Sequence, residues 1–192
     1  LDGGGSWALI QVRTLIDLYS KVGDGSDISG HELLRKFDLI VANSAGSLTL
    51  GGLIKNLPLK EILDYFINPK QREKLFVEYS LREKLLITLL HLIGIGPNYI
   101  TEEKLSGLEA ILGREGDQFV TQVPAFVGKG NRGRRPHVVF CAFDYAVKRG
   151  LSFRQCVHRF AARCVTMCHI KAALACHAST NAQLTLSGAP RA

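Results

Sequence analysis

Apolar residues near the start of the chain recur at the spacing of an amphipathic helix. Leu9, Val12, Ile16 and Tyr19 lie three or four positions apart, which places them on one side of an α-helix. We therefore predict a helix over residues 7–20. Three glycines and Ser6 come immediately before it, so the helix is expected to begin directly after a glycine loop, with Ser6 as its N-cap.

A short, uninterrupted apolar run further along predicts a buried strand. This strand is expected over residues 37–42, after a short helix over 31–36. Small residues at 43–47 indicate a tight turn, and the leucines and glycines that follow it indicate a closely packed helix. The sequence thus predicts a strand, a sharp turn and a helix in direct succession.

The rest of the chain alternates between helical and extended patterns. Helical spacing predicts further helices over residues 59–66, 69–76, 80–92, 102–112 and 165–178. A second strand is expected over 137–143, with a hairpin through Arg149-Gly150 into 151–153, and residues 114–136 are expected to form a loop. Strands separated by helices predict the α/β class, here one three-layer α/β/α domain over residues 1–192.

The composition fits a globular domain. Of 192 residues, 46% are hydrophobic and 21% are charged, which is enough to bury one sizeable core. The longest mostly apolar stretch, residues 85–95, is about half the roughly 20 residues that a membrane-spanning helix requires. We therefore predict no membrane span.

The positive charge is concentrated near the C-terminal end. All 17 acidic residues precede residue 145, whereas seven of the 24 Lys and Arg residues follow it. Such an asymmetry can accompany nucleic-acid binding, but these seven charges are spread over 48 residues. A solvated surface is the favoured interpretation, and we expect no nucleic-acid partner.

All five cysteines lie in the last third of the chain. An odd number of cysteines confined to one region fits reduced thiols better than a secreted disulfide framework, and the expected location is cytoplasmic. The alternative is a metal site built from Cys164, Cys168, His169, Cys176 and His177. Structural zinc sites usually use paired short Cys knuckles, so buried thiols are favoured and no metal is expected.

The motif with the clearest chemical meaning is Ala42-Asn43-Ser44-Ala45-Gly46, between the predicted strand and helix. It matches the nucleophile elbow G-x-S-x-G with Ala in place of the first Gly, and its small residues permit the strained turn that exposes a serine hydroxyl. At a helix N-terminus, Ser44 would lie where negative charge on oxygen is stabilised. The alternative is an ordinary helix N-terminus with Ser44 as its cap.

The glycine loop Gly3-Gly4-Gly5 permits two functional interpretations. Its unobstructed N–H groups could bind an oxyanion or a phosphate. The spacing to Ala8 also matches the relaxed dinucleotide-binding pattern G-x-G-x-x-G/A, which requires an acidic residue at the end of a second strand. Asp24 and Asp27 are near the required distance but lie in a Gly/Ser turn, so nucleotide binding is the weaker alternative.

A serine nucleophile requires a base. The usual hydrolase order of Ser, Asp and His would nominate Asp144, at the end of the second predicted strand, with His158, His169 or His177. The alternative is that Asp144 only caps the strand end or pairs with a neighbouring Lys or Arg.

Together, these motifs resemble the patatin-like phospholipase family. The similarity lies in Leu1-Asp2-Gly3-Gly4-Gly5 before a helix, in the Ser44 elbow about 40 residues later, and in Leu50-Gly51-Gly52-Leu53 after it. It extends to Phe143-Asp144-Tyr145 after a strand and to the small-residue segment Ala178-Ser179-Thr180-Asn181-Ala182. The resemblance covers nearly the whole chain.

The resemblance implies a lipid acyl hydrolase with a Ser-Asp dyad, no catalytic histidine and no cofactor or metal. Ser44 would be the nucleophile, and Gly3, Gly4 and Gly5 would form the oxyanion hole. The implied substrates are acyl esters of phospholipids or galactolipids, reached through peripheral contact with a membrane surface.

Three positions depart from the family pattern D-G-G-G-x-R-G and its partner motifs. Trp7 and Ala8 replace the Arg and the last Gly of the loop, and Ala42 replaces the first Gly of the elbow. No D-G-G or D-G-A sequence follows Ser44, so the aspartate motif is missing. We expect either a domain that lacks its first strand, before Leu1, and its C-terminal part, or an inactive relative that binds lipid or another partner.

Overall fold

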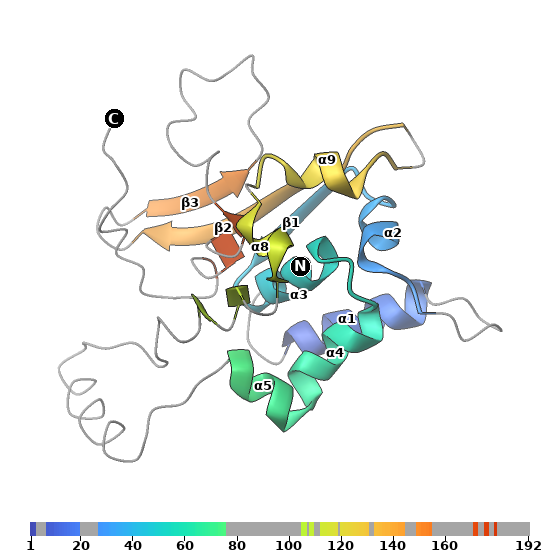
Figure 1. Ribbon diagram of the computed structural model, residues 1–192, viewed down its shortest axis with the longest axis vertical. Coiled ribbons are helices and arrows are strands. Elements are labelled where there is room, and N and C mark those ends of the chain that lie inside the picture. Colours follow the sequence, from blue (N-terminus) through green and yellow to red (C-terminus); the bar gives the residue numbers. More distant parts are fainter. Residues whose placement is uncertain are drawn as a thin grey trace.

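The computed structural model describes residues 1–2, 7–19, 27–75, 105–106, 108–109, 112–118, 120–130, 133–144, 149–154, 171–172, 175–176 and 179. Helices pack beside a small sheet (Figure 1). In chain order the elements are α1 Trp7–Tyr19, α2 Gly30–Leu34, β1 Leu39–Asn43, α3 Ala45–Ile54, α4 Leu59–Ile67, α5 Pro69–Leu75, α8 Arg114–Asp117, α9 Val123–Val127, β2 His137–Asp144 and β3 Arg149–Arg154.

The sheet has the strand order β1-β2-β3. β1 and β2 are parallel, with Asn43 opposite Cys141, and β2 and β3 form the predicted antiparallel hairpin. At the other edge of β1, Leu1 donates its N–H to the Val41 carbonyl at 2.8 Å and accepts from Asn43 N–H at 3.0 Å. This is the hydrogen-bonding pattern of a parallel neighbour, so the first residue of the chain is attached beside β1.

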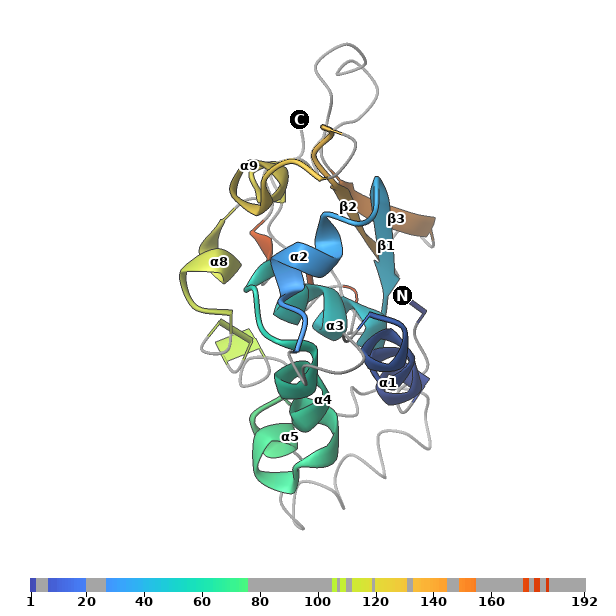
Figure 2. The ribbon, with the colours of Figure 1, turned by 90° about the vertical axis from the view of Figure 1, so that its right-hand side faces the viewer.

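The two faces of the sheet differ in their environment. Ile40, Ala42, Val138, Phe140 and Phe153 are buried on one face. On the opposite face of β1, Leu39 and Val41 are 57% and 41% exposed. In Figure 2, α2, α3, α8 and α9 lie together on one side of the sheet. The α/β class is confirmed, and the described residues show one of the two helical layers that were predicted.

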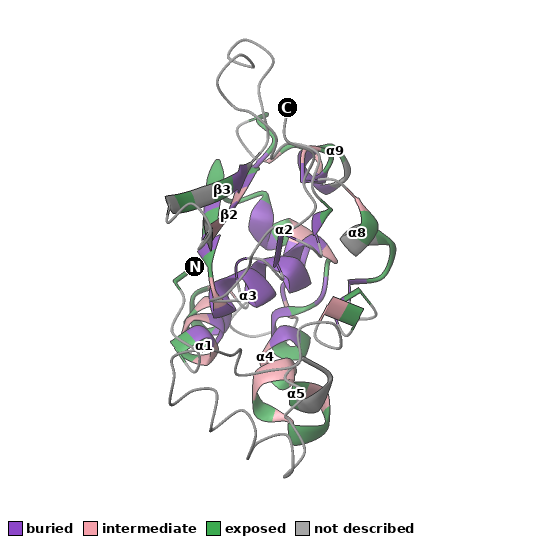
Figure 3. Ribbon diagram, turned by 90° about the vertical axis from the view of Figure 1, so that its left-hand side faces the viewer, coloured by how far each residue is buried: buried purple, intermediate pink, exposed green. Residues whose placement is uncertain are grey.

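Helix α3 is the centre of the core. All ten of its residues are buried (Figure 3), which is expected for a helix that is apolar on every side. A Cβ added to Gly52 would lie 2.8 Å from Ile62 Cγ1, so this glycine allows α4 to pack closely against α3. The position of α3 fixes that of the turn from which it starts.

Most predicted elements are confirmed with boundaries shifted by one or two residues, as is usual for patterns read from sequence. The prediction of a loop over residues 114–136 was wrong, because this stretch contains α8 and α9. Val120, Val123 and Val127 are completely buried there, and Pro124 lies in the first turn of α9, where proline is tolerated. The helix predicted over 80–92, and most of those over 102–112 and 165–178, fall outside the described residues.

Within the described part of the chain, no helix combines the length and the apolar character needed to cross a membrane.

Candidate active site

Ser44 occupies a strained turn between β1 and α3. Its backbone has φ 50° and ψ −125°, a combination that non-glycine residues rarely adopt and that costs about 1–3 kcal/mol. Although Ser44 stands at the N-cap position of α3, its side chain makes no capping hydrogen bond. The strain therefore does not serve helix capping, and the backbone has the sharp strand-to-helix form that a nucleophile elbow requires.

Gly46, two positions after Ser44, has no room for a side chain because the backbone of the chain's first residues lies against it. A Cβ added to Gly46 would come within 2.7 Å of the Leu1 carbonyl carbon and 2.9 Å of the Asp2 oxygen. Ala42 is completely buried and Ala45 is 6% exposed. The predicted turn over 43–47 is shorter than expected: Ala42 and Asn43 end β1, Ala45 and Gly46 begin α3, and the role of these residues in an elbow stays a prediction.

Both ends of the glycine loop are fixed, although Gly3, Gly4 and Gly5 themselves fall outside the described residues. Asp2 lies against the elbow, and its carbonyl accepts a hydrogen bond from Gln11 Nε2 at 3.0 Å. At the other end, α1 begins at Trp7 and packs into the core through Ala8, Val12 and Ile16. The chain therefore enters the loop in direct contact with the elbow, and the oxyanion role of the three glycines stays a prediction.

A second serine, Ser179, contacts the elbow and was given no role by the sequence. Ser44 N–H donates to Ser179 Oγ at 3.0 Å, and the Ser47 hydroxyl donates to the same oxygen at 2.6 Å. The Cys176 thiol lies 3.1 Å from the Ser47 carbonyl oxygen. The signal that could have indicated this cluster is Ser47 itself, one of two polar residues, with Thr49, on the buried helix α3.

The segment that carries Cys176 and Ser179 is held against α8. Lys171 Nζ lies 2.7 Å from Asp117 Oδ1, and Ala172 N–H donates to the Gln118 carbonyl at 2.8 Å. The hydrogen bond with Asp117 raises the pKa of the exposed Lys171 amine. These contacts hold the segment beside α3, where it appears as the short red stretch in Figure 1.

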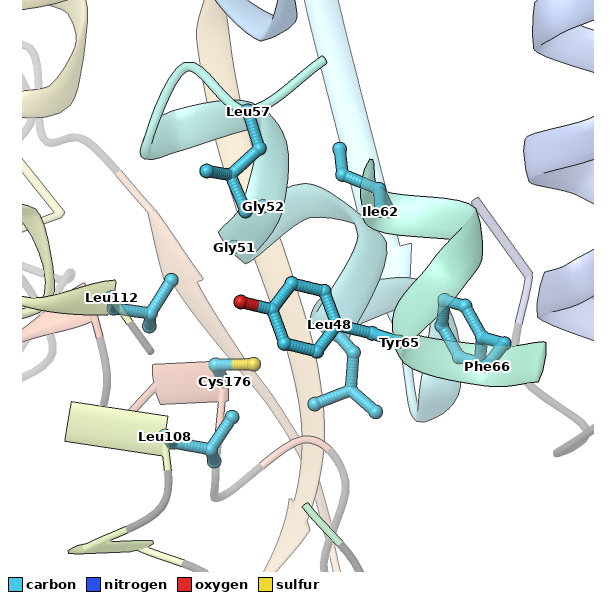
Figure 4. A pocket seen from close by; sticks show the side chains of 10 residues that line it. All are labelled: Leu48, Gly51, Gly52, Leu57, Ile62, Tyr65, Phe66, Leu108, Leu112 and Cys176. Carbon is cyan, nitrogen blue, oxygen red and sulfur yellow. The ribbon is translucent and has the colours of Figure 1, made fainter. Parts of the chain in front are cut away.

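An apolar pocket lies along α3, beginning one helical turn after Ser44 (Figure 4). Helices α3 and α4 contribute most of its lining, together with Leu108, Leu112 and Cys176. The Tyr65 hydroxyl points into it, and burial, followed by the nearby carboxylates of Glu61 and Asp64, raises the pKa of this phenol. Apart from this hydroxyl and the Cys176 thiol, the side chains that line the pocket are hydrocarbon.

The candidate base Asp144 and Ser44 both follow the direction of parallel strands to the C-terminal end of the sheet. Asp144 is the last residue of β2, and β2 runs parallel to β1, so the C-terminal ends of both strands lie at the same end of the sheet. The Asp144 side chain and the three histidines nominated with it, His158, His169 and His177, fall outside the described residues, and that triad stays a prediction.

The sequence also offered a dinucleotide-binding site and a metal site as alternatives. Asp27 Oδ2 accepts a hydrogen bond from Lys60 N–H at 2.8 Å, at the start of α4. Asp27 thus caps a helix. Residues 20–26 before it, which include Asp24, lie outside the described residues, so the dinucleotide alternative, which requires an acidic residue at the end of a second strand, stays a prediction. Among the residues that are described, no group of three His, Cys, Asp or Glu side chains could hold a metal. Of the proposed ligands only Cys176 is described, and Cys164, Cys168, His169 and His177 are not.

A family model described as patatin-like phospholipase matches residues 1–182. A search of curated proteins found no match.

Proposed function

Since the chain belongs to the patatin-like phospholipase family, we propose that it is a lipid acyl hydrolase with Ser44 as its nucleophile. The family hydrolyses lipid esters, and the proposal extends this to the residues of the present chain. The single observation that carries it is the strained backbone of Ser44 between a parallel strand and the buried helix α3. A strain of this kind is typical of functional sites.

The proposed reaction begins with attack of Ser44 Oγ on the ester carbonyl. The hydroxyl proton passes to a carboxylate base, and the carbonyl oxygen becomes an oxyanion. The first N–H groups of a helix have no partner within the helix, so the start of α3 and the loop Gly3-Gly4-Gly5 would both stabilise that charge. The alcohol part of the lipid leaves with a proton, and water then hydrolyses the acyl-enzyme.

The acyl part of the substrate would occupy the apolar pocket along α3. Leu48 and Gly51 line this pocket and lie on the same side of α3 as Ser44. An acyl chain bound to Ser44 could therefore extend along the helix into apolar surroundings. This supports a phospholipid or galactolipid as the class of substrate.

The exposed side of α1 supports contact with a lipid surface. Trp7, Ile10 and Leu18 are 63%, 50% and 69% exposed, and their spacing places them on one side of the helix. Trp7 is two positions after Gly5, the last glycine of the loop. An apolar helix face beside the site would bring Ser44 close to lipid at the membrane interface.

A second function, lipid binding without hydrolysis, is favoured by a different observation. The sequence after Ser44 contains no D-G-G or D-G-A motif, which the family uses to supply the base. Under this alternative, the glycine loop and pocket bind an ester that is not cleaved.

Hydrolysis of p-nitrophenyl butyrate by the full chain and by Ser44→Ala tests the proposal. We expect the variant to lose about 10³-fold or more in kcat, while Ser152→Ala, which removes an exposed serine on β3, keeps the wild-type rate. Equal rates with and without Ser44 would exclude Ser44 as nucleophile. Binding to phospholipid vesicles without any hydrolysis would favour the alternative.

A further inference from the structure

The backbone of Ser44 is bonded to a residue 135 positions further along the chain. Ser179 is 8% exposed, and its Oγ accepts a hydrogen bond from Ser44 N–H at 3.0 Å. An amide N–H can only donate, so this hydroxyl oxygen is the acceptor. The Ser47 hydroxyl, one turn along α3, lies 2.6 Å from the same oxygen.

The strained conformation of Ser44 requires such a contact. A residue at φ 50° and ψ −125° has no intrinsic preference for that geometry, and it persists only where the surrounding structure fixes it. The side chain of Ser44 does not cap α3, so it provides no local restraint of that kind. Without Ser179 Oγ, the partly buried Ser44 N–H would lose its acceptor, and the turn could relax towards an ordinary backbone conformation.

Ser179 can act as a restraint because its own position is fixed on two sides. Towards α3, the Cys176 thiol lies 3.1 Å from the Ser47 carbonyl oxygen. Towards α8, Ala172 N–H donates to the Gln118 carbonyl at 2.8 Å, and Lys171 pairs with Asp117. The segment is thus bonded at several points before it reaches the elbow.

We propose that Ser179 is a positioning residue, which holds the nucleophile elbow in its strained conformation through the Ser44 N–H. Its consequence for catalysis rests on the proposed function. Ser179 acts on the Ser44 backbone and through it sets the direction of Ser44 Oγ. Misplacement of a reacting group by about 1 Å can cost about 100-fold in rate, so this hydrogen bond would influence kcat and leave substrate binding largely unchanged.

The test compares Ser179→Ala, Ser179→Thr and the control Ser152→Ala in the full chain. Amide hydrogen exchange of Ser44, followed by NMR, reports on the hydrogen bond directly. Hydrolysis of p-nitrophenyl butyrate gives kcat and KM. For Ser179→Ala we expect exchange at Ser44 to accelerate about tenfold or more, while exchange at Ile40 in β1 stays at the wild-type rate.

In the same variant, kcat should fall about 10- to 100-fold with little change in KM. Ser179→Thr keeps the acceptor oxygen and should restore both quantities, and Ser152→Ala should match the wild type. Should Ser179→Ala not fold, Ser179→Cys replaces it, because a thiol keeps the shape and is a weak acceptor.

Several results would overturn the proposal. They are unchanged exchange at Ser44, accelerated exchange with an unaltered kcat, or a loss that extends to Ile40 and changes KM as well. Absence of Ser44-dependent hydrolysis in the wild type is a separate result, which would contradict the proposed function. In that case the amide hydrogen exchange of Ser179→Ala is the only test of the proposal. Acceleration confined to Ser44 would support the restraint by Ser179, and unchanged exchange would exclude it.

Discussion

Gly46 lies where the first residues of the chain cross the turn at Ser44. A side chain there would meet backbone atoms of Leu1 and Asp2, and backbone moves less easily than the end of a flexible side chain. The glycine of the elbow motif is therefore explained by a contact with the start of the chain. Its replacement should affect stability as well as the site.

We predict that Gly46→Ala lowers the free energy of unfolding by about 1–3 kcal/mol, because Leu1 and Asp2 must move away from the elbow. Urea unfolding measures this change. Gly150→Ala is the matched control, since a Cβ at Gly150 has no neighbour within 4 Å, and it should be nearly neutral. Equal losses in the two variants would show that the contact with Leu1 is not the cause.

The raised pKa of Tyr65 leads to a prediction about how the stability of the fold depends on pH. Burial and the carboxylates of Glu61 and Asp64 raise its pKa in the folded protein, so above pH about 10 the unfolded chain loses this proton first. The contribution to stability is complete below that pH and is lost as the pH rises through the raised pKa. Chemical unfolding of Tyr65→Phe at pH 8 and above pH 10 should show a smaller alkaline loss than the wild type. An identical loss would contradict this assignment.

At the scale of secondary structure, α3 serves both the elbow and the pocket. Its first residue follows Ser44, and its later turns line the apolar pocket with Leu48, Gly51 and Gly52. The two glycines differ in their surroundings. An added Cβ would press on Ile62 at Gly52, whereas at Gly51 its closest neighbours are Leu112 Cδ2 at 3.2 Å and Cys176 Sγ at 3.7 Å. Side chains at position 51 can therefore shorten the pocket.

We predict that Gly51→Leu shifts the preference of the proposed hydrolase towards short acyl chains. Relative to wild type, kcat/KM for p-nitrophenyl octanoate should fall about tenfold more than that for the acetate, and Gly51→Ala should give a smaller change in the same direction. Gly150→Ala serves as the control with wild-type selectivity. A uniform loss over all chain lengths would indicate that the acyl group lies elsewhere.

At the scale of the whole molecule, two groups of exposed apolar side chains among the described residues can be compared. One is the side of α1 with Trp7, Ile10 and Leu18, beside the glycine loop, and the other is the face of β1 with Leu39 and Val41. Leu39 begins β1 and Ser44 follows its end, so the second region starts at the far end of that strand. The α1 region begins close in sequence to the glycine loop of the proposed site.

Trp7→Ala should therefore weaken binding to vesicles of phosphatidylcholine and phosphatidylglycerol by about tenfold, because an aromatic side chain is lost from the lipid interface. Sedimentation with the vesicles measures this. Leu39→Ala removes a side chain of similar exposure, 57% against 63%, and should bind as the wild type does. Equal weakening by both variants would argue against docking through α1.

Local patterns in the sequence were sufficient for most elements and for the turn at Ser44. Helical spacing, a short apolar run and small residues around a serine depend only on neighbours in the chain, and the strands, α1 and α3 formed as predicted. The prediction of a loop over 114–136 failed because α8 and α9 are too short to show a clear helical periodicity. The burial of Val120, Val123 and Val127 is set by the tertiary packing.

The tertiary structure alone decided which distant residues meet at the site. That Ser44 is bonded to Ser179, and that Gly46 lies against Leu1, follows from the packing of segments that no local pattern connects. Backbone strain at Ser44 is also invisible in the sequence, because it is maintained by those contacts and not by the residue's own preference. The sequence determined where a nucleophile could be placed, and the fold determined what holds it there.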